Sequence, residues 1–291
     1  MLVTMKEILD RASKEDYAVG APNVGNSCEV DAAIEAAEEM NSPLILDVHF
    51  DNIGPTKVPN ARAFAEWMRR RANESPVPIA INEDHGRSYQ TAMRNIQAGC
   101  TSVMADRSSL PFEENVAEVK KVVEAAHACG ISVEAELGHV GKADTYAKLD
   151  NEEGSGGDSV YTKVEEAVSF VEQTGVDCLA ISIGTAHGAW PKGVVPHLDF
   201  DRLKAIKEAL GHDYPLVLHG SSGTPVEEQR KACAMGINKV NIATDLSMAA
   251  MANVLASEGK GNAFALAKAG FKNKLKEMIP VYGSDGKAWK E

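Results

Sequence analysis

The sequence predicts a TIM barrel, (β/α)8, built as a single domain over residues 1–291 with a helical C-terminal extension. Short apolar runs alternate with segments of helical period along most of the chain. The runs lack the polar alternation of a strand with one wet face, so they are typical of parallel strands that are buried on both sides. Eight strand–helix repeats in this length favour a closed barrel, and a doubly wound open sheet is the alternative fold.

The expected strands are eight apolar runs of similar length. They cover residues 17–23, 42–48, 77–84, 101–106, 132–137, 178–183, 215–220 and 239–245. Among these runs only the last contains a lysine, and this residue, Lys239, stands at its first position. We therefore expect no lysine in the interior of a strand.

The segments between these runs have the spacing of amphipathic helices, and several of them end on glycine, the preferred residue after a helix. Two stretches break the repeat. The acidic, glycine- and serine-rich stretch 138–161 follows the fifth run, and a loop of this length is usually functional. The tail from Leu246 to Glu291 has a helical pattern with a break at SEGKGN (257–262), which predicts an eighth helix plus an extension packed on the barrel.

The charge balance and the cysteines limit the class of protein. A net charge of -12 disfavours binding to nucleic acid or to a membrane surface, because both need basic patches. No apolar run approaches the roughly 18 residues that span a bilayer, and the N-terminus has no signal-type run. The five cysteines are scattered without a CxxC pair, which disfavours disulfides and thiolate metal sites. We expect a cytoplasmic protein that holds any anionic substrate at a local site.

Three histidines follow expected strands at equivalent places. His85 follows the third run, His187 comes after the sixth, and His219 lies at the end of the seventh. In a barrel, the carboxyl ends of the strands form the catalytic face, so these imidazoles are expected to converge. A single buried histidine is usually a satisfied core group, but three neutral imidazoles without cysteines suit zinc. Three protein ligands leave one position open for substrate, as in catalytic zinc sites.

The carboxylate of Asp84 directly precedes His85. A carboxylate beside a metal ligand lies within reach of a bound substrate and can carry one of its protons. The alternative role for Asp84 is to cap the helix that starts near Ser88.

Glycine and hydroxyl residues after the seventh and eighth runs indicate a phosphate site. HGSSG (219–223) and NIATD (241–245) offer backbone N–H groups and hydroxyls at helix N-termini, where anions bind. In barrels, the loops after strands seven and eight are a recurrent phosphate site. Lys192, shortly after His187, is the candidate for an added positive charge.

Ordered motifs along nearly the whole chain resemble the zinc-dependent class II fructose-bisphosphate aldolase family. They are YAVGAPNVGN, DHG, VEAELGHVG, EEAVSFVEQTGVDCLAISIGTAHG, PLVLHGSSG and KVNIATD, in this order. The short chain is similar to the subgroup that includes tagatose-bisphosphate aldolases. The resemblance implies a zinc-dependent aldehyde-lyase of carbohydrate metabolism. Its substrate would be a ketose 1-phosphate or ketose bisphosphate, cleaved reversibly to dihydroxyacetone phosphate and an aldehyde.

The family's roles carry over to matching residues. The resemblance implies that His85, His187 and His219 bind zinc, with Glu136 as an alternative or neighbouring ligand, and that Asp84 is the acid/base at the hydroxyl of the cleaved carbon. It also implies a monovalent cation, Na⁺ or K⁺, beside the phosphate, and a homodimer or homotetramer. The residues implied to line the site and hold dihydroxyacetone phosphate are Asn23, Gly188, Lys192, Gly220, Ser222, Asn241 and Thr244.

The chain departs from the family pattern at the base that removes the C1 proton. In the family this base is a carboxylate in the loop after ELG, usually in a GGEED-like run. Here the loop reads GKADTY, which puts Asp144 in that place, with Glu152 and Glu153 as the alternatives.

The chain departs from the family pattern a second time, at the residues expected to contact the part of the substrate that becomes the aldehyde. Asp47 and His49 stand at the end of the second run, where fructose-bisphosphate enzymes tend to carry a small hydroxyl residue. The tail also lacks an evident Asp-Arg pair for a second phosphate, and its candidates are Lys272, Lys274 and Lys276. The aldehyde therefore remains open between a phosphorylated one, an unphosphorylated one and a different sugar.

Three rival functions make different demands on the sequence. A zinc-dependent hydrolase on a barrel commonly presents a His-x-His pair on the first strand, and the run 17–23 has none. A Schiff-base aldolase needs a lysine inside a strand, whereas Lys239 only opens the eighth run. A non-catalytic sugar-phosphate binding barrel fits the sequence if the stretch 138–161 supplies no base.

Overall fold

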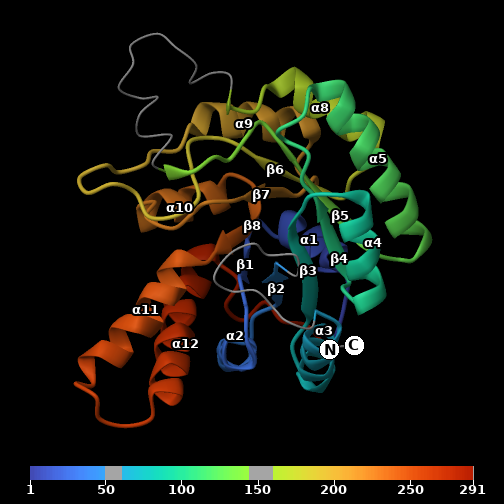
Figure 1. Ribbon diagram of the computed structural model, residues 1–291. Coiled ribbons are helices and arrows are strands. Elements are labelled where there is room, and N and C mark those ends of the chain that lie inside the picture. Colours follow the sequence, from blue (N-terminus) through green and yellow to red (C-terminus); the bar gives the residue numbers. More distant parts are fainter. Residues whose placement is uncertain (50–60, 144–159, 291) are drawn as a thin grey trace.

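The computed structural model describes residues 1–49, 61–143 and 160–290, and its strands form one parallel sheet of eight (Figure 1). The strands are β1 (Val19–Pro22), β2 (Leu44–Val48), β3 (Ile79–Gly86), β4 (Ser102–Ala105), β5 (Ser132–Leu137), β6 (Cys178–Ile181), β7 (Leu216–Leu218) and β8 (Ile237–Ile242).

Each strand pairs with its neighbour in the chain from β2 to β8, and β1 pairs with β8. A parallel bridge between Asn23 and Asp47, at the ends of β1 and β2, brings the two remaining edges together. The sheet is thus a nearly closed barrel, which confirms the predicted (β/α)8 fold over the open sheet.

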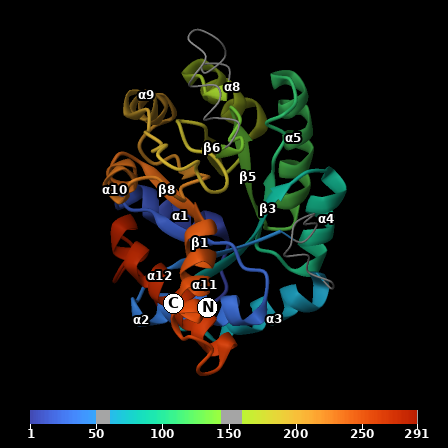
Figure 2. The ribbon, with the colours of Figure 1, turned by 60° about the vertical axis from the view of Figure 1, so that its left-hand side comes forward.

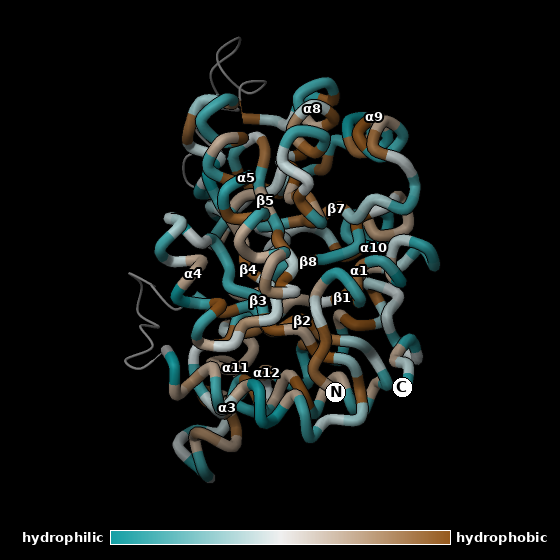
Figure 3. Tube along the Cα trace, turned by 90° about the vertical axis from the view of Figure 1, so that its right-hand side faces the viewer, coloured by the Kyte–Doolittle hydropathy of each residue, from teal (hydrophilic) through white to brown (hydrophobic). Residues whose placement is uncertain are grey.

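Helices surround the barrel, as the strand–helix repeat predicts. In the described part of the chain they are α1 (Met5–Lys14), α2 (Ser27–Glu39), α3 (Ala61–Glu74), α4 (Tyr89–Ala98), α5 (Phe112–Ala128), α8 (Val164–Thr174), α9 (Phe200–Leu210), α10 (Val226–Ala234), α11 (Thr244–Ala256) and α12 (Ala263–Tyr282). Much of their outer surface is hydrophilic, whereas strands such as β2 are hydrophobic (Figure 3). Among the described helices, none is both long and apolar enough to cross a membrane.

The C-terminal tail forms the predicted extension. Helices α11 and α12 make a hairpin that projects from the barrel (Figures 1 and 2), and they are separated at the expected break. The buried side chains of Leu275 and Tyr282 in α12 pack on Gly20 of β1, and Lys272 and Lys276 form ion pairs with Glu39 of α2. These contacts fasten the hairpin to the wall of the barrel.

The eighth strand differs from the prediction at both ends. It begins at Ile237, because Ile237 still pairs with Leu216 of β7, and Asn238 is a buried part of the strand. Lys239 therefore lies inside the strand, and the prediction that it opens the strand is wrong. The strand extends one turn of alternation further toward its amino end than the apolar pattern indicates, because Asn238 is polar and interrupts that pattern. The strand also stops at Ile242, so that Thr244 begins α11 and is not part of the strand.

The interior of the barrel is layered. Near the amino ends of the strands, Ile45, Ala80 and Val217 pack with Met5 and Ile8 of α1 in one apolar cluster. The next inward positions carry polar groups that are fully or almost fully buried. They are Asp47, Asn82, Glu134 and Lys239. Because every second residue of a strand faces the same side, the following inward positions form the rim where the predicted site lies.

Candidate active site

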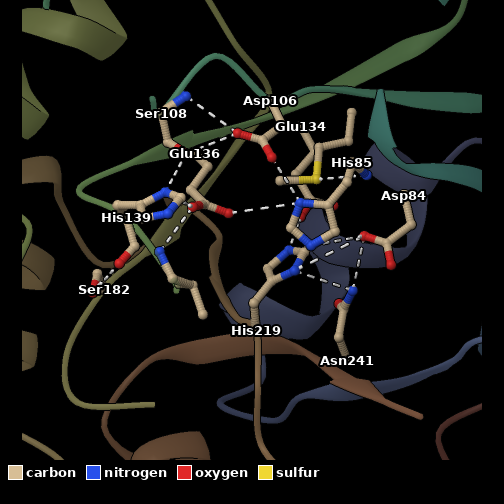
Figure 4. A network of polar contacts seen from close by, with 12 residues as sticks. Asp84, His85, Asp106, Ser108, Glu134, Glu136, His139, Ser182, His219 and Asn241 are labelled. Carbon is tan, nitrogen blue, oxygen red and sulfur yellow. Dashed lines mark hydrogen bonds and ion pairs between the residues drawn. The ribbon is translucent and has the colours of Figure 1, made fainter. Parts of the chain in front are cut away.

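The alternation along the strands brings polar side chains from distant parts of the chain to one rim. Asn23 follows β1, Asp84 lies in β3, Glu136 in β5 and Asn241 in β8, while His219 follows β7 directly. Each continues the inward face of its strand above the polar layer. Figure 4 shows how the side chains of most of these residues point toward one another.

The structure brings the three predicted histidines together. The ring centroids of His85 and His187 are 4.8 Å apart, those of His85 and His219 are 4.8 Å apart, and those of His187 and His219 are 6.0 Å apart. One nitrogen of each ring lies within 4.8 Å of the others. His85 has a positive φ of 53°, unusual for a residue other than glycine, and this strained backbone belongs to the site.

Carboxylates hold the rings of His85 and His219 in orientation around this centre. His85 Nδ1 lies 2.8 Å from Asp106 Oδ2, and His219 Nε2 lies 2.7 Å from Glu134 Oε1. A carboxylate on one ring nitrogen fixes the proton there and leaves the other nitrogen as the ligand atom. The buried Nε2 atoms of His85 and His187 have no hydrogen-bond partner in the described chain, and His219 Nδ1 lies 3.4 Å from Asn241 Nδ2. This donor set fits a metal ion that prefers imidazole, such as zinc.

Burial and neighbouring charges set the protonation of the three rings. Burial lowers the pKa of His187 to about 3, helped by the nearby His85 and His219. Burial also lowers the pKa of His219, although Glu134 opposes the shift. For His85, burial alone would lower the pKa, but Asp84, Asp106 and Glu136 outweigh it and raise the pKa to about 10. Two rings are therefore neutral near pH 7, and the third holds a proton that a metal would displace.

Asp84 is held as a carboxylate by several donors. Asn23 Nδ2 donates to its Oδ2 at 2.7 Å, Asn241 Nδ2 donates to its Oδ1 at 3.2 Å, and His49 Nε2 lies 3.2 Å from Oδ2. Burial would raise the pKa of Asp84, but the charges of His85 and His49 outweigh it and lower the pKa well below its usual value. The side chain is thus an ionised proton acceptor at the rim.

The capping alternative for Asp84 is wrong. Ser88 is the N-cap of α4, and its side chain accepts a hydrogen bond from Thr91 N at 3.0 Å. Asp84 lies within β3 and faces the rim.

A second cluster lies beside the histidines and shares His85 with them. Asp106, Glu136 and His85 also place three possible ligand atoms close together. Glu136 Oε1 accepts from Val140 N at 3.0 Å, while its buried Oε2 has no hydrogen-bond partner in the described chain. Burial, with a contribution from Asp106, raises the pKa of Glu136 to about 8. Asp106 was not among the predicted residues, although it ends the fourth run as Asp84 ends the third.

A cavity of about 270 Å³ opens at the rim. Its lining includes His85, His187 and Asp84 together with most of the residues predicted to contact substrate. These are Asn23, Gly188, Gly220, Ser222, Asn241 and Thr244. Lys192 does not belong to this lining and is exposed in the loop after His187. Asp144, Glu152 and Glu153 lie outside the described residues.

The side of the cavity formed after β7 and β8 includes the amino end of α11, where Asp245 N donates to Ser222 Oγ at 3.4 Å. Ala243, the N-cap of α11, provides no side-chain acceptor for the first N–H groups of that helix. Gly220 has a φ of 64°, and a Cβ there would come within 2.6 Å of the backbone of Ala186, beside His187. Only glycine allows the β7 turn to pack this closely against the loop of His187, so the turn links this side of the cavity to the histidines.

Lys239 is an ammonium ion in the middle of the barrel. Its Nζ donates to Asp47 Oδ2 and Glu134 Oε2 at 2.9 Å each, and to Asn241 Oδ1 at 2.8 Å. Burial would lower the pKa of Lys239, but Asp47 and Glu134 outweigh it and raise the pKa above its usual value. A lysine that forms a Schiff base needs a lowered pKa, whereas the pKa of Lys239 is raised. The position of Lys239 inside a strand therefore does not support the Schiff-base mechanism.

Comparison with known proteins agrees with this geometry. The model of a family described as fructose-bisphosphate aldolase class-II matches residues 3–287. A fructose-bisphosphate aldolase from Thermus caldophilus is 38% identical over 316 residues, covering 99% of this chain and 100% of that protein.

Solved structures are also similar to the chain. The YdjI aldolase from Escherichia coli K12 has a TM-score of 0.85 and 33% identity, covering 99% of this chain and 100% of its own. A putative fructose-1,6-bisphosphate aldolase from Coccidioides immitis has a TM-score of 0.82 and 26% identity, covering 97% of each chain.

Proposed function

The chain belongs to the class II fructose-bisphosphate aldolase family, and we propose that it is a zinc-dependent aldolase that releases dihydroxyacetone phosphate. Its substrate would be a ketose 1-phosphate or ketose bisphosphate, cleaved reversibly to this phosphate and an aldehyde. The observation that carries the proposal is the convergence of three imidazoles, of which His85 and His187 line the cavity and His219 is buried beside them, next to the carboxylate of Asp84.

The residues for zinc are His85, His187 and His219, and Glu136 is an alternative ligand beside them. When bound, zinc supplies a Lewis acid that polarises the ketose carbonyl and stabilises the negative charge left when the carbon–carbon bond breaks. The protein's contribution is to keep the ring nitrogens of His85 and His219 oriented through Asp106 and Glu134.

Asp84 is the proposed proton carrier at the hydroxyl of the cleaved carbon. In cleavage it accepts the hydroxyl proton, and in condensation it returns this proton to the new hydroxyl. Asn23 and Asn241 hold its two oxygens by separate hydrogen bonds, which keeps the carboxylate aimed at the cavity. The carboxylate that removes the C1 proton is proposed to be Asp144, with Glu152 and Glu153 as the alternatives.

The phosphate is proposed to bind where β7 and β8 end. The N–H groups at the start of α11 and the turn at Gly220 support this, because the amino end of a helix favours anions. Gly188, Ser222 and Thr244 line the same cavity. Lys192 remains a candidate from its loop, and a monovalent cation, Na⁺ or K⁺, is proposed beside the phosphate.

The described residues show no basic group for a second phosphate in the cavity. In the described part of the chain its lining contains no lysine or arginine, and Glu29 adds a carboxylate. Lys272 and Lys276, which were candidates for a second phosphate, form ion pairs with Glu39. The aldehyde stays open within the proposal between a phosphorylated one, an unphosphorylated one and a different sugar.

We further propose a cytoplasmic homodimer or homotetramer. The family resemblance supports the assembly, and the five free cysteines are in keeping with a reducing compartment. Sedimentation of the purified protein tests the assembly.

Proton exchange at C1 of dihydroxyacetone phosphate tests the function without knowledge of the aldehyde. We expect the protein to catalyse exchange of one C1 proton of dihydroxyacetone phosphate in deuterated water, measured by NMR. This exchange should stop when zinc is chelated and should resume when zinc is returned. His187→Ala is expected to abolish exchange. His127→Ala, which removes a surface histidine paired with Asp177, is the control and should retain it. No exchange by the zinc-loaded protein would favour a sugar-phosphate binding barrel instead.

A further inference from the structure

Lys239 lies beneath the rim with no access to solvent and contacts neither the cavity nor a predicted metal ligand. Its ammonium group has three acceptors, the carboxylates of Asp47 and Glu134 and the amide oxygen of Asn241. Two of these acceptors also contact residues of the site. Glu134 contacts His219, and Asn241 contacts Asp84.

The first path runs through Glu134. Its Oε2 accepts from Lys239 at 2.9 Å, and its Oε1 lies 2.7 Å from His219 Nε2. Because the ammonium group fixes one oxygen, the other stays directed at the imidazole and holds the ring proton on Nε2. The Nδ1 atom of His219 is then the unprotonated nitrogen on the side of the metal centre.

The second path runs through Asn241. Lys239 can only donate, so the oxygen of the Asn241 amide must face it, at 2.8 Å. The amide NH₂ group is thereby turned to Asp84, where it donates to Oδ1 at 3.2 Å. Without the ammonium group the amide can flip, and its oxygen would then face the carboxylate of Asp84.

Fold stability does not by itself explain why this level of the barrel carries charges. Directly below, apolar residues such as Ile45 and Val217 fill the same interior, and well-packed apolar groups are often as stable as a buried ion pair. The charged layer therefore costs desolvation, and its upward hydrogen bonds all end on groups of the site.

We propose that Lys239 is a positioning residue, which orients the metal ligand His219 through Glu134 and the acid/base Asp84 through Asn241. This inference rests on the proposed function, since it assumes that the three histidines bind zinc.

Metal affinity and the spectrum of the Co²⁺-substituted protein test the inference independently of turnover. Lys239→Met is expected to weaken zinc binding about 10- to 100-fold in competition with a chelator, and to change the Co²⁺ absorption spectrum. The control is Lys207→Met. The Nζ of Lys207 donates to Tyr214 O and Asn238 Oδ1, and Lys207 has no contact with the site. This control should lower thermal stability without changing either metal readout.

A second variant covers the case in which Lys239→Met does not fold, because that change leaves two buried carboxylates without their cation. The double variant Lys239→Met/Asp47→Asn removes the negative charge of Asp47 together with the positive charge of Lys239. It still lacks the ammonium group that holds Glu134 and Asn241. The same loss of zinc affinity is expected.

Zinc affinity and a Co²⁺ spectrum equal to wild type in a folded Lys239 variant would overturn the inference and reduce Lys239 to a structural group. Failure of the wild-type protein to bind zinc or Co²⁺ would instead overturn the proposed function, so the two failures are distinguishable.

Discussion

Glu134 accepts a hydrogen bond from His219 across 2.7 Å, and both side chains are completely buried inside the barrel. The other oxygen of this carboxylate is held by Lys239. Both neighbours are donors, so the site at position 134 requires a group that accepts on both sides. Only an ionised carboxylate has this property among side chains of this length.

Glu134→Gln is expected to damage the metal site more than its small change in shape suggests. The amide can accept on only one side, so its NH₂ group must face either Lys239 or the ring N–H of His219. We expect zinc affinity to fall about 10- to 100-fold and the ring proton to redistribute between the two nitrogens. Chelator competition and ¹⁵N NMR of the histidine ring measure these effects. Unchanged affinity would show that His219 needs no partner to hold its orientation.

Asp84→Asn is expected to separate the two halves of the reaction. In the proposed mechanism Asp84 carries the proton of the hydroxyl at the cleaved carbon, whereas another carboxylate removes the C1 proton. Cleavage should therefore fall roughly 10²- to 10⁴-fold, while proton exchange at C1 of dihydroxyacetone phosphate persists. Parallel loss of both activities with normal zinc content would contradict the assigned role. The measurement compares a coupled cleavage assay with NMR exchange on one zinc-loaded preparation.

Zinc binding is expected to release protons and to strengthen as the pH rises. The pKa of His85 is raised to about 10 and that of Glu136 to about 8, so both groups hold protons near pH 7 in the metal-free protein. Zinc must displace the proton of His85, and also that of Glu136 if this carboxylate coordinates. Raising the pH removes this competition. Titration calorimetry in two buffers of different ionisation heat counts the protons, and a value of zero would contradict these pKa shifts.

The ion pairs between α2 and α12 predict a small loss of stability in acid. Hydrogen bonds from Lys276 and Lys272 lower the pKa of Glu39 to about 2. Because the pKa of Glu39 is lower in the folded protein than the unfolded value of 4.5, the ionised Glu39 stabilises the fold at a pH above about 5. This contribution disappears as the pH falls from about 5 toward 2. The pairs are exposed, so the effect is small. Thermal unfolding of Glu39→Gln should depend slightly less on pH over this range than wild type, and identical pH profiles would refute the link.

The fold and the histidine centre follow from the sequence because parallel strands end on one face. His85 lies near the carboxyl end of β3, and His187 and His219 follow β6 and β7, so the barrel alone brings them together. Asp106 obeys the same rule at the end of β4, and applying the rule to every strand would have found it.

The polar layer below the rim could not be predicted in the same way. The sequence predicts that Lys239 opens the eighth strand, whereas the strand begins at Ile237 and encloses Lys239. A charged residue inside a doubly buried strand is rare. What makes Lys239 acceptable there is its contact with Asp47 and Glu134, which come from strands far away in the chain. Such pairing, like the choice of ring nitrogen in each histidine, appears only when the strands are assembled.

Gly220→Ala is expected to affect both stability and metal binding, because a Cβ at this position would press on the backbone of Ala186, next to His187. Gly175→Ala is the matched control: its φ of 68° is close to the 64° of Gly220, but a Cβ there meets nothing within 4 Å. The control should cost only the backbone strain, about 1–2 kcal/mol. Gly220→Ala should cost about 1–3 kcal/mol more through overpacking, and weaken zinc binding by moving His187. Chemical unfolding and chelator competition of the two variants measure the difference. Equal losses of stability with equal zinc affinity would mean that the turn after β7 does not position the histidine.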